Sequence, residues 1–420
     1  MNLNPRRILQ TMAASAMAFA LIASAQSPAA PAAAPAPAAQ APAPASAPAA
    51  PADAPAPLST FVLTGPLQWL PPAIFDAGPL GKLSVNGIVT GFSQFQNNSV
   101  PGDDSAQATL SNGEIFIQKA DGKVQYYIQA GVYTMPTLGN TFLSAEKTLS
   151  SFYGPVPVAY LKLQAAKNTQ FLIGQLPTLM GAESTFTYQN FNIERGIVWN
   201  QENAINRGIQ VNQTLGKYLA AAVSWNDGYY SNRYSWLSGS VTLTKGSHRL
   251  VYDGMGHLGQ TKFQTAATPV QNNGYMHAVI YTYTKGPWIV SPYFQYGKLP
   301  ANAKVGVPVG TSATGGALNV SRAFKSGFSL PARVEYLTSS GSDTDGSVNM
   351  LGFGAGSSGF TFTATPTYQK GGMFVRGDLG LVHASNYTQG SVFGKTGTEA
   401  DQFRGVLEFG FIFGNNIAGK

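Results

Sequence analysis

The final strand-like stretch of the chain, QFRGVLEFGFIF at residues 402–413, decides the fold. Every second residue back from Phe413 is apolar or glycine, whereas Arg404 and Glu408 lie at the intervening positions. Successive side chains of a β-strand point to opposite faces, so Phe409, Phe411 and Phe413 share one face and the charges share the other. Such a strand suits a sheet packed on a core, or a barrel with lipid outside and water inside.

The composition favours the barrel. Only 11% of the 420 residues are Asp, Glu, Lys or Arg, against about 25% in soluble domains, so a soluble surface would lack charges. After the N-terminus, no apolar run reaches the roughly 18 residues of a transmembrane helix. The formal net charge of +7 comes without a Lys/Arg-rich cluster, so nucleic acid is not an expected partner. The chain has no cysteine, which excludes disulfides and thiolate metal sites.

The N-terminal region predicts export. Arg6 and Arg7 precede an apolar run that ends at Ala23-Ser24-Ala25, so residues 1–25 read as a cleaved signal peptide; the alternative is an uncleaved anchor. Residues 26–57 are almost entirely Ala and Pro, which predicts an extended periplasmic linker, either a passive tether or an attachment to another periplasmic component. The expected order continues with a pre-barrel segment (58–82), a transmembrane barrel (83–413) and a tail (414–420).

The rest of the chain alternates with period two, as in FTFTATPTY at 360–368 and VQYYIQAGVY at 124–133. Short Gly-, Asn- or Lys-containing turns alternate with long irregular segments, which is typical of an up-and-down antiparallel barrel with turns at one rim and loops at the other. The long segments are 97–110, 136–156, 178–206, 227–233, 258–273, 298–315, 339–358 and 385–401. Seven turns and eight loops predict about sixteen strands, provided that VNMLGFGAGSSG (348–359) is loop. The last strand must then pair with the first, near 83–95, because lipid offers no hydrogen bonds to a free edge.

Aromatic side chains near the short turns fit a membrane interface, because such rings concentrate at the boundary of lipid and water. Six of them share the outward parity of their strands: Phe171, Tyr283, Trp288, Phe328, Tyr368 and Phe413.

At this point the chain resembles a family, the outer-membrane β-barrel porins described as OmpL-like. The resemblance covers essentially everything after the linker. It is carried by GIVWNQENAINRGIQVNQTLGKYLAAAVSWNDGYYSNRYSW (196–236), TATPTYQKGGMFVRGDLGLVHAS (363–385) and RGVLEFGFIF (404–413). It implies a channel in the outer membrane of a Gram-negative bacterium, and trimers are common among porins of this size in such families. One departure is that seven residues follow Phe413, where such barrels usually end on an aromatic residue.

Charged strand residues fall mainly on the inward parity, as a barrel requires, because Arg or Lys facing lipid at mid-depth costs about 2–4 kcal/mol. The pore-lining candidates are Lys162, Arg249, Asp253, Arg333, Glu335, Arg376, Asp378, Arg404 and Glu408. They could tune ion selectivity, or they could pair as structural ladders that keep the lumen wet.

The 178–206 segment is the longest and least polar loop, with Phe186, Tyr188, Phe191 and Trp199. Apolar side chains in such number need burial. We expect this loop to fold into the lumen and narrow it, with Glu194, Arg195 and Glu202 near the constriction. The alternative is packing over the rim or against a neighbouring subunit.

The predicted function is passive diffusion of small hydrophilic solutes or ions through an outer-membrane porin. The alternative is a loop-plugged barrel that acts in structure or adhesion through 136–156 and 178–206. Enzyme activity is not expected, because no nucleophile motif accompanies His248, His257, His277 or His383. No cofactor or metal site is expected either; the partners are membrane lipid and small solutes, with a homotrimer as an open possibility.

Overall fold

The computed structural model describes residues 65–415. The chain divides into two units, Met1–Ala49 and Ala50–Lys420, and every described residue belongs to the second. The predicted signal peptide and the Ala/Pro linker lie outside the described residues, as do residues 58–64 and 416–420.

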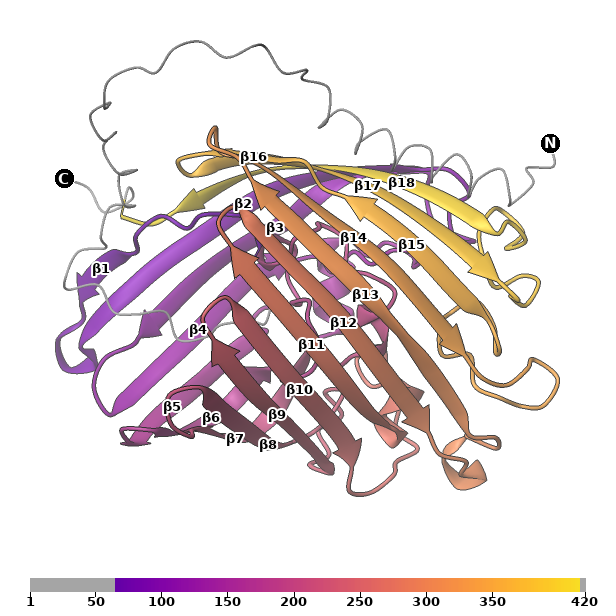
Figure 1. The fold of residues 1–420 in the computed structure, drawn as a ribbon, viewed down its shortest axis with the longest axis horizontal. Coiled ribbons are helices and arrows are strands. Elements are labelled where there is room, and N and C mark those ends of the chain that lie inside the picture. The colour runs from indigo at the N-terminus through magenta and orange to yellow at the C-terminus, as the bar shows by residue number, and fades with distance from the viewer. Residues whose placement is uncertain (1–64, 416–420) are drawn as a thin grey trace, which may run out of the picture. The chain divides into compact units, whose positions relative to one another are not determined.

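The regular structure of the described chain is almost entirely antiparallel strands, which join in one sheet (Figure 1). The strands are β1 (Ala73–Asp76), β2 (Lys82–Gln96), β3 (Ala106–Lys119), β4 (Val124–Tyr133), β5 (Val158–Ala166), β6 (Thr169–Pro177), β7 (Ile205–Thr214), β8 (Leu219–Asn226), β9 (Trp236–Lys245), β10 (His248–His257), β11 (Tyr275–Lys285), β12 (Trp288–Leu299), β13 (Thr311–Ala323), β14 (Phe328–Ser339), β15 (Ser358–Ala364), β16 (Thr367–Lys370), β17 (Met373–Ser385) and β18 (Asp401–Phe413).

The sheet closes into a barrel of sixteen spanning strands, as predicted. Strands β15 and β16 are two parts of one strand, because both pair with β14 and with β17. The break falls at Pro366, which has no N–H to donate to a ladder. The short β1 pairs only with the start of β2. Closure joins β18 to β2, with Phe413 opposite Gly87 and Arg404 opposite Gln96.

The connections also alternate as predicted, with seven short turns at one rim and eight longer loops at the other. The segment 348–359 is mostly loop, since β15 begins only at Ser358. One feature was not predicted: helix α2 (Ala145–Ser151) lies inside the loop between β4 and β5. No helix among residues 65–415 has the length and apolar character needed to cross a membrane.

The alternation of side chains gives the expected faces. On β18, the Phe409 side chain points outward and is 60% exposed, whereas the neighbouring Glu408 points inward and is fully buried. On β15, Phe360 and Phe362 point outward, and Thr361 and Thr363 are buried. A one-residue shift of register would exchange these faces, so the pairing fixes which residues can meet inside the barrel.

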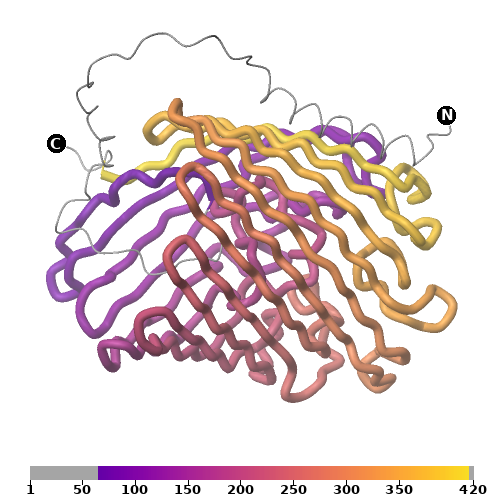
Figure 2. The backbone as a smooth tube through the Cα atoms, in the orientation of Figure 1, coloured from indigo at the N-terminus to yellow at the C-terminus, as the bar shows by residue number. Residues whose placement is uncertain are grey.

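The segment between β6 and β7, residues 178–204, is called the inner loop below. Nearly all of it is buried, and it contacts inward-facing strand residues such as Arg376 and Asp378. Its backbone passes within the outline of the barrel (Figure 2). Its Met180, Phe191 and Ile197 belong to one buried cluster with Trp236 and Leu337 of the wall. Its Phe186, Tyr188 and Trp199 belong to a second cluster with residues of β3, β4 and β5.

Candidate functional site in the barrel lumen

Three arginines on neighbouring inward faces hold the inner loop, namely Arg333 on β14, Arg376 on β17 and Arg404 on β18. Each is fully buried. Arg376 donates to the carbonyl oxygens of Thr187 (3.0 Å), Asn190 (2.9 Å) and Phe191 (2.9 Å). Three carbonyl groups of an irregular loop thus obtain partners that the loop cannot supply itself.

The other two arginines extend this contact. Arg333 donates to the Glu194 carbonyl oxygen at 3.0 Å and pairs with the Glu183 carboxylate. Arg404 pairs with the Glu194 carboxylate at 2.8 Å and also donates to the carbonyl oxygen of Asn140, in the loop before α2, at 2.8 Å. We call Arg333, Arg376 and Arg404 the arginine row.

The predicted carboxylates stand among these arginines and bind the loop from the same wall. Glu335 accepts from the backbone N–H groups of Ile197 (3.1 Å) and Val198 (3.2 Å). Asp378 accepts from the backbone N–H of Glu194 at 2.8 Å. Glu408 accepts from the Thr187 hydroxyl at 2.9 Å and pairs with Arg376 at 3.4 Å. All three are fully buried, so these wall charges contact the loop rather than open water.

The three predicted constriction residues lie inside the barrel within the inner loop and are buried. Glu194 is held by Arg404, as described above. The Arg195 guanidinium donates to the Thr185 carbonyl oxygen and lies 4.4 Å above the Trp199 ring. Burial lowers the pKa of Arg195 to about 9. Glu202 accepts from the Tyr293 hydroxyl, and burial raises the pKa of Glu202 well above its ordinary value.

The remaining candidates occupy the opposite wall. Arg249 on β10 and Lys162 on β5 are half-buried, whereas Asp253 on β10 is buried. Arg249 borders a cavity of about 380 Å³ between strands β5–β10 and the first part of the inner loop, residues 178–185. Lys162 lies opposite Leu172, another wall residue of that cavity. The structure therefore separates the nine pore-lining candidates: six contact the loop, two cations lie at or beside open space, and Asp253 is buried in the opposite wall.

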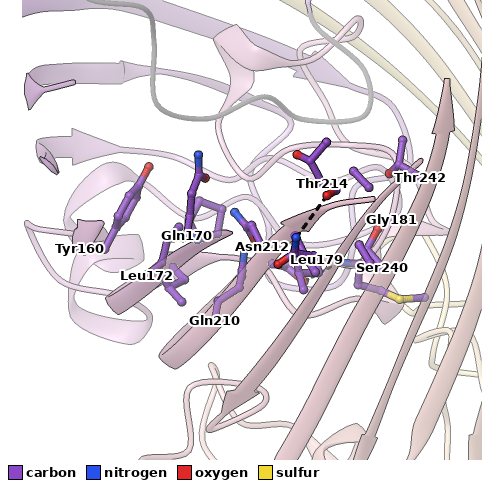
Figure 3. A pocket seen from close by; sticks show the side chains of 18 of the residues that line it. Tyr160, Gln170, Leu172, Leu179, Gly181, Gln210, Asn212, Thr214, Ser240 and Thr242 are labelled. Atoms are coloured by element: carbon purple, nitrogen blue, oxygen red, sulfur yellow. Dashed lines mark hydrogen bonds between the residues drawn. The ribbon is translucent and has the colours of Figure 1, made fainter. Parts of the chain in front are cut away.

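The cavity wall is mostly uncharged and mixes polar with apolar side chains (Figure 3). The labelled side chains come from four strands (β5, β6, β7 and β9) and the inner loop: Tyr160, Gln170, Leu172, Leu179, Gly181, Gln210, Asn212, Thr214, Ser240 and Thr242. The cavity also reaches Lys167 and Asn168 in the turn between β5 and β6. It thus extends from the short-turn rim up to the inner loop.

Residues 65–71, for which the sequence analysis predicted no position in the barrel, also contact the inside of the barrel. The backbone N–H of Gly65 donates to the Gln189 carbonyl oxygen of the inner loop at 2.9 Å. The Trp69 ring packs edge-on against Phe116 and Tyr188 at centroid distances of 5.2 and 5.7 Å. Gln68 exchanges backbone and side-chain hydrogen bonds with Gln369 at the end of β16. Residues 65–71, called the mouth segment below, therefore run across the short-turn end of the lumen.

Two inward carboxylates were missed in the sequence. Glu114 on β3 is buried and accepts from the Gln129 amide at 2.6 Å. Its alternation with the outward Ile115 would have revealed it. Glu183 lies in the inner loop, where no strand parity applies.

Among residues 65–415 no group of three or more His, Asp or Glu side chains could hold a metal ion.

The four histidines do not converge. His277 and His248 point outward. The His277 ring lies 2.8 Å from the Tyr252 hydroxyl, and the His248 ring lies 2.6 Å from the Tyr281 hydroxyl. His383 pairs with Asp401 at 2.7 Å near the loop rim, and His257 ends β10.

Several solved structures share the fold. An anion-selective porin from Comamonas acidovorans matches with a TM-score of 0.58 and 10% identity over 79% of this chain and 99% of the porin. OmpT of Vibrio cholerae matches with a TM-score of 0.52 and 11% identity, over 79% of this chain and 97% of OmpT. OmpF of Salmonella typhi matches with a TM-score of 0.51 and 12% identity, over 79% of this chain and 98% of OmpF. No curated protein matches the chain.

Residues 82–413 match the family described as "Putative beta-barrel porin-2, OmpL-like". This range runs from the first residue of β2 to the last of β18, so it is the whole closed barrel. The chain therefore belongs to this β-barrel porin family and is a porin of the Gram-negative outer membrane.

Proposed function

We propose that this porin conducts small hydrophilic solutes along the wall formed by β5–β10, past residues 178–185 of the inner loop. The observation that carries the proposal is the asymmetry of the lumen. The arginine row and its carboxylates bind the loop to β14, β17 and β18, whereas about 380 Å³ of space remains on the opposite side. Barrels of sixteen to eighteen strands are wide enough to leave an aqueous channel.

The charges along this route favour anions. Arg249 and Lys167 border the cavity and Lys162 lies beside it. The acidic side chain at its wall, Glu183, is largely buried and pairs with Arg333. A water-filled passage lined by one sign of charge concentrates ions of the opposite sign. We infer a preference for small anionic or neutral polar solutes.

The chain has no cysteine, so single cysteines can map the route directly. Asn212→Cys and Ser240→Cys face the cavity, and Thr363→Cys is the matched inward control on β15, beneath the inner loop. A cationic methanethiosulfonate reagent should lower single-channel conductance at the first two positions and leave the third unchanged. Block at Thr363→Cys alone would contradict the route. A folded barrel without any conductance would favour the loop-plugged structural protein instead.

We also propose that the protein assembles as a homotrimer and has no enzymatic activity. The trimer is supported by OmpT of Vibrio cholerae, which has a trimer form. A channel without catalysis is supported by the family and by the separation of the four histidines. Light scattering of the detergent-solubilised protein tests the assembly: a monomer mass after gentle extraction would contradict it.

A further inference from the structure

Each of the seven short turns, with the strand residue that precedes it, carries a lysine. These lysines are Lys123, Lys167, Lys217, Lys245, Lys285, Lys325 and Lys370. In the same seven segments, all within the described chain, the one carboxylate is Asp121, which pairs with Lys119 at 2.9 Å. Polar turns need no particular charge, so a single sign at every turn points to an anionic neighbour at this rim.

The cations gather most densely on the outward face of β9–β13. Lys285 lies opposite Trp288, and Trp288 lies opposite Arg322. On the adjacent strands, Lys245 lies opposite His248. Directly opposed side chains on one face are about 5 Å apart at Cβ, so Lys285 and Arg322 flank Trp288 closely. All five residues share the outward parity of their strands with exposed apolar neighbours such as Leu243 and Leu318.

The geometry of Arg322 marks the level of the membrane interface. Its guanidinium lies 5.0 Å from the Trp288 ring centroid and 4.8 Å from that of Phe324. Aromatic rings occupy the headgroup level of a bilayer, and stacking on two of them holds the planar guanidinium while leaving its edge donors available. No Asp or Glu occurs in residues 241–250, 281–290 or 319–328 of the described chain, so no carboxylate of these segments neutralises the cluster.

We propose that Lys285 and Arg322, which flank Trp288, bind the phosphate headgroup of an anionic phospholipid in the periplasmic leaflet. Lys245, which lies two strands from Lys285 on the same outward face, adds positive charge beside this site. Short turns of outer-membrane barrels are periplasmic, and this face borders lipid rather than the lumen. Arginine forms paired hydrogen bonds with phosphate, and lysine adds point charge. Trp288 and Leu330 offer exposed apolar surface beside the cluster for the acyl chains. The lipid would anchor β9–β13 at a fixed depth.

The test uses the full mature protein in micelles that contain equal amounts of phosphatidylglycerol and phosphatidylcholine with identical acyl chains. Native mass spectrometry gives the ratio of the two bound lipids. The variant Lys245→Gln/Lys285→Gln/Arg322→Gln should lower this ratio on the order of tenfold, because each cation near a membrane surface strengthens anionic-lipid binding. The variant Lys123→Gln/Lys167→Gln/Lys370→Gln removes the same charge from the same rim and should retain most of the preference.

An unchanged ratio in the first variant, or an equal loss in the second, overturns the proposed site. Should the triple variant fold poorly, Lys285→Gln alone gives the same comparison, because that side chain is exposed. Excess inorganic phosphate should leave phosphatidylglycerol bound. Displacement by phosphate would show a simple anion site and would overturn the proposal of a lipid ligand.

Discussion

At the scale of single residues, the lumen shows how burial changes the role of a charge. Arg376 is fully buried, and its charge is compensated by Glu408 and by three carbonyl groups of the inner loop. Hydrogen bonds to a charged group contribute about 1.5–3 kcal/mol each, and a buried charge without them would be very costly. Such a side chain holds the loop in place, so we expect its replacement to affect conduction through the position of the loop.

Replacing either of two adjacent residues on β18, Glu408 or Phe409, by arginine should therefore destabilise the barrel, for different reasons. Phe409→Arg places a charge in hydrocarbon, which costs about 2–4 kcal/mol near the midplane. Glu408→Arg places a second guanidinium beside Arg376 and removes the acceptor of Thr187, so we expect a loss of about 3–5 kcal/mol, typical of a broken buried pair. Arg249→Gln, on the cavity wall, should leave folding intact and shift the reversal potential toward cations. Urea unfolding in detergent and salt-gradient recordings measure these effects. A tolerated Glu408→Arg would mean that water reaches this residue.

Glu202 should give the loop a dependence on pH. Its carboxyl group accepts from Tyr293, and the carboxylates of Glu183, Asp253 and Glu335 add to burial in raising its pKa. Gly181 permits this close approach: its φ is +87°, and a Cβ there would collide with the Glu202 carboxylate. An acid with a raised pKa in the folded state contributes stability that is complete below its unfolded pKa, near 4.5, and is lost as pH rises through the folded value.

The inner loop should consequently loosen at alkaline pH, when Glu202 ionises in its buried position. We expect single-channel conductance to rise or to fluctuate more as pH increases, and Glu202→Gln should abolish this dependence while preserving the neutral-pH conductance. A pH profile that is identical in the wild type and in Glu202→Gln would assign the effect to another group.

At the scale of elements, the inner loop behaves as part of the barrel core. Its backbone is irregular apart from two short 3-10 turns, Thr187–Gln189 and Trp199–Gln201. The sequence predicted its burial from four aromatic residues. It could not predict which wall the loop would bind, because strand parity shows that a charge points inward but not what stands in front of it. Arg376 and Arg249 have the same pattern in sequence, yet one holds the loop and the other borders the cavity.

Removing two members of the arginine row, Arg333 and Arg376, should release the part of the loop that they hold without opening the barrel. Arg333→Met/Arg376→Met leaves the backbone carbonyls of Thr187, Asn190, Phe191 and Glu194 without their donors. We expect larger, noisier conductance and faster proteolysis within residues 184–202, because sixteen strands still close the sheet. The carboxylates Glu183, Glu335 and Glu408 would lose their arginine partners. The changes Glu183→Gln, Glu335→Gln and Glu408→Gln should therefore accompany the variant. Deleting 184–202 should give the same larger conductance, and an unchanged conductance would place the solute route elsewhere.

At the scale of the whole molecule, local alternation was enough to predict the closed sheet. Sixteen strands, the seven turns and the pairing of β18 with β2 all follow from faces that differ in polarity. The contents of the lumen did not follow, since they depend on contacts between residues far apart in the chain. The pairing of Gln68 with Gln369 is one such contact. Neither residue carries a pattern that signals it, and the mouth segment was predicted only as a stretch that precedes the barrel.

The mouth segment should restrict the periplasmic end of the channel, because Trp69 and Leu67 pack against the wall and the inner loop there. A chain that keeps the signal peptide but lacks residues 26–71 should still assemble, since β1 pairs with β2 without it and the barrel closes between β2 and β18. Its conductance should exceed that of the wild type. The matched control lacks residues 26–57 alone, which removes the linker and keeps the mouth segment. If both truncations raise conductance equally, the linker and not the mouth segment limits the flow. If neither does, the route along β5–β10 bypasses this segment altogether.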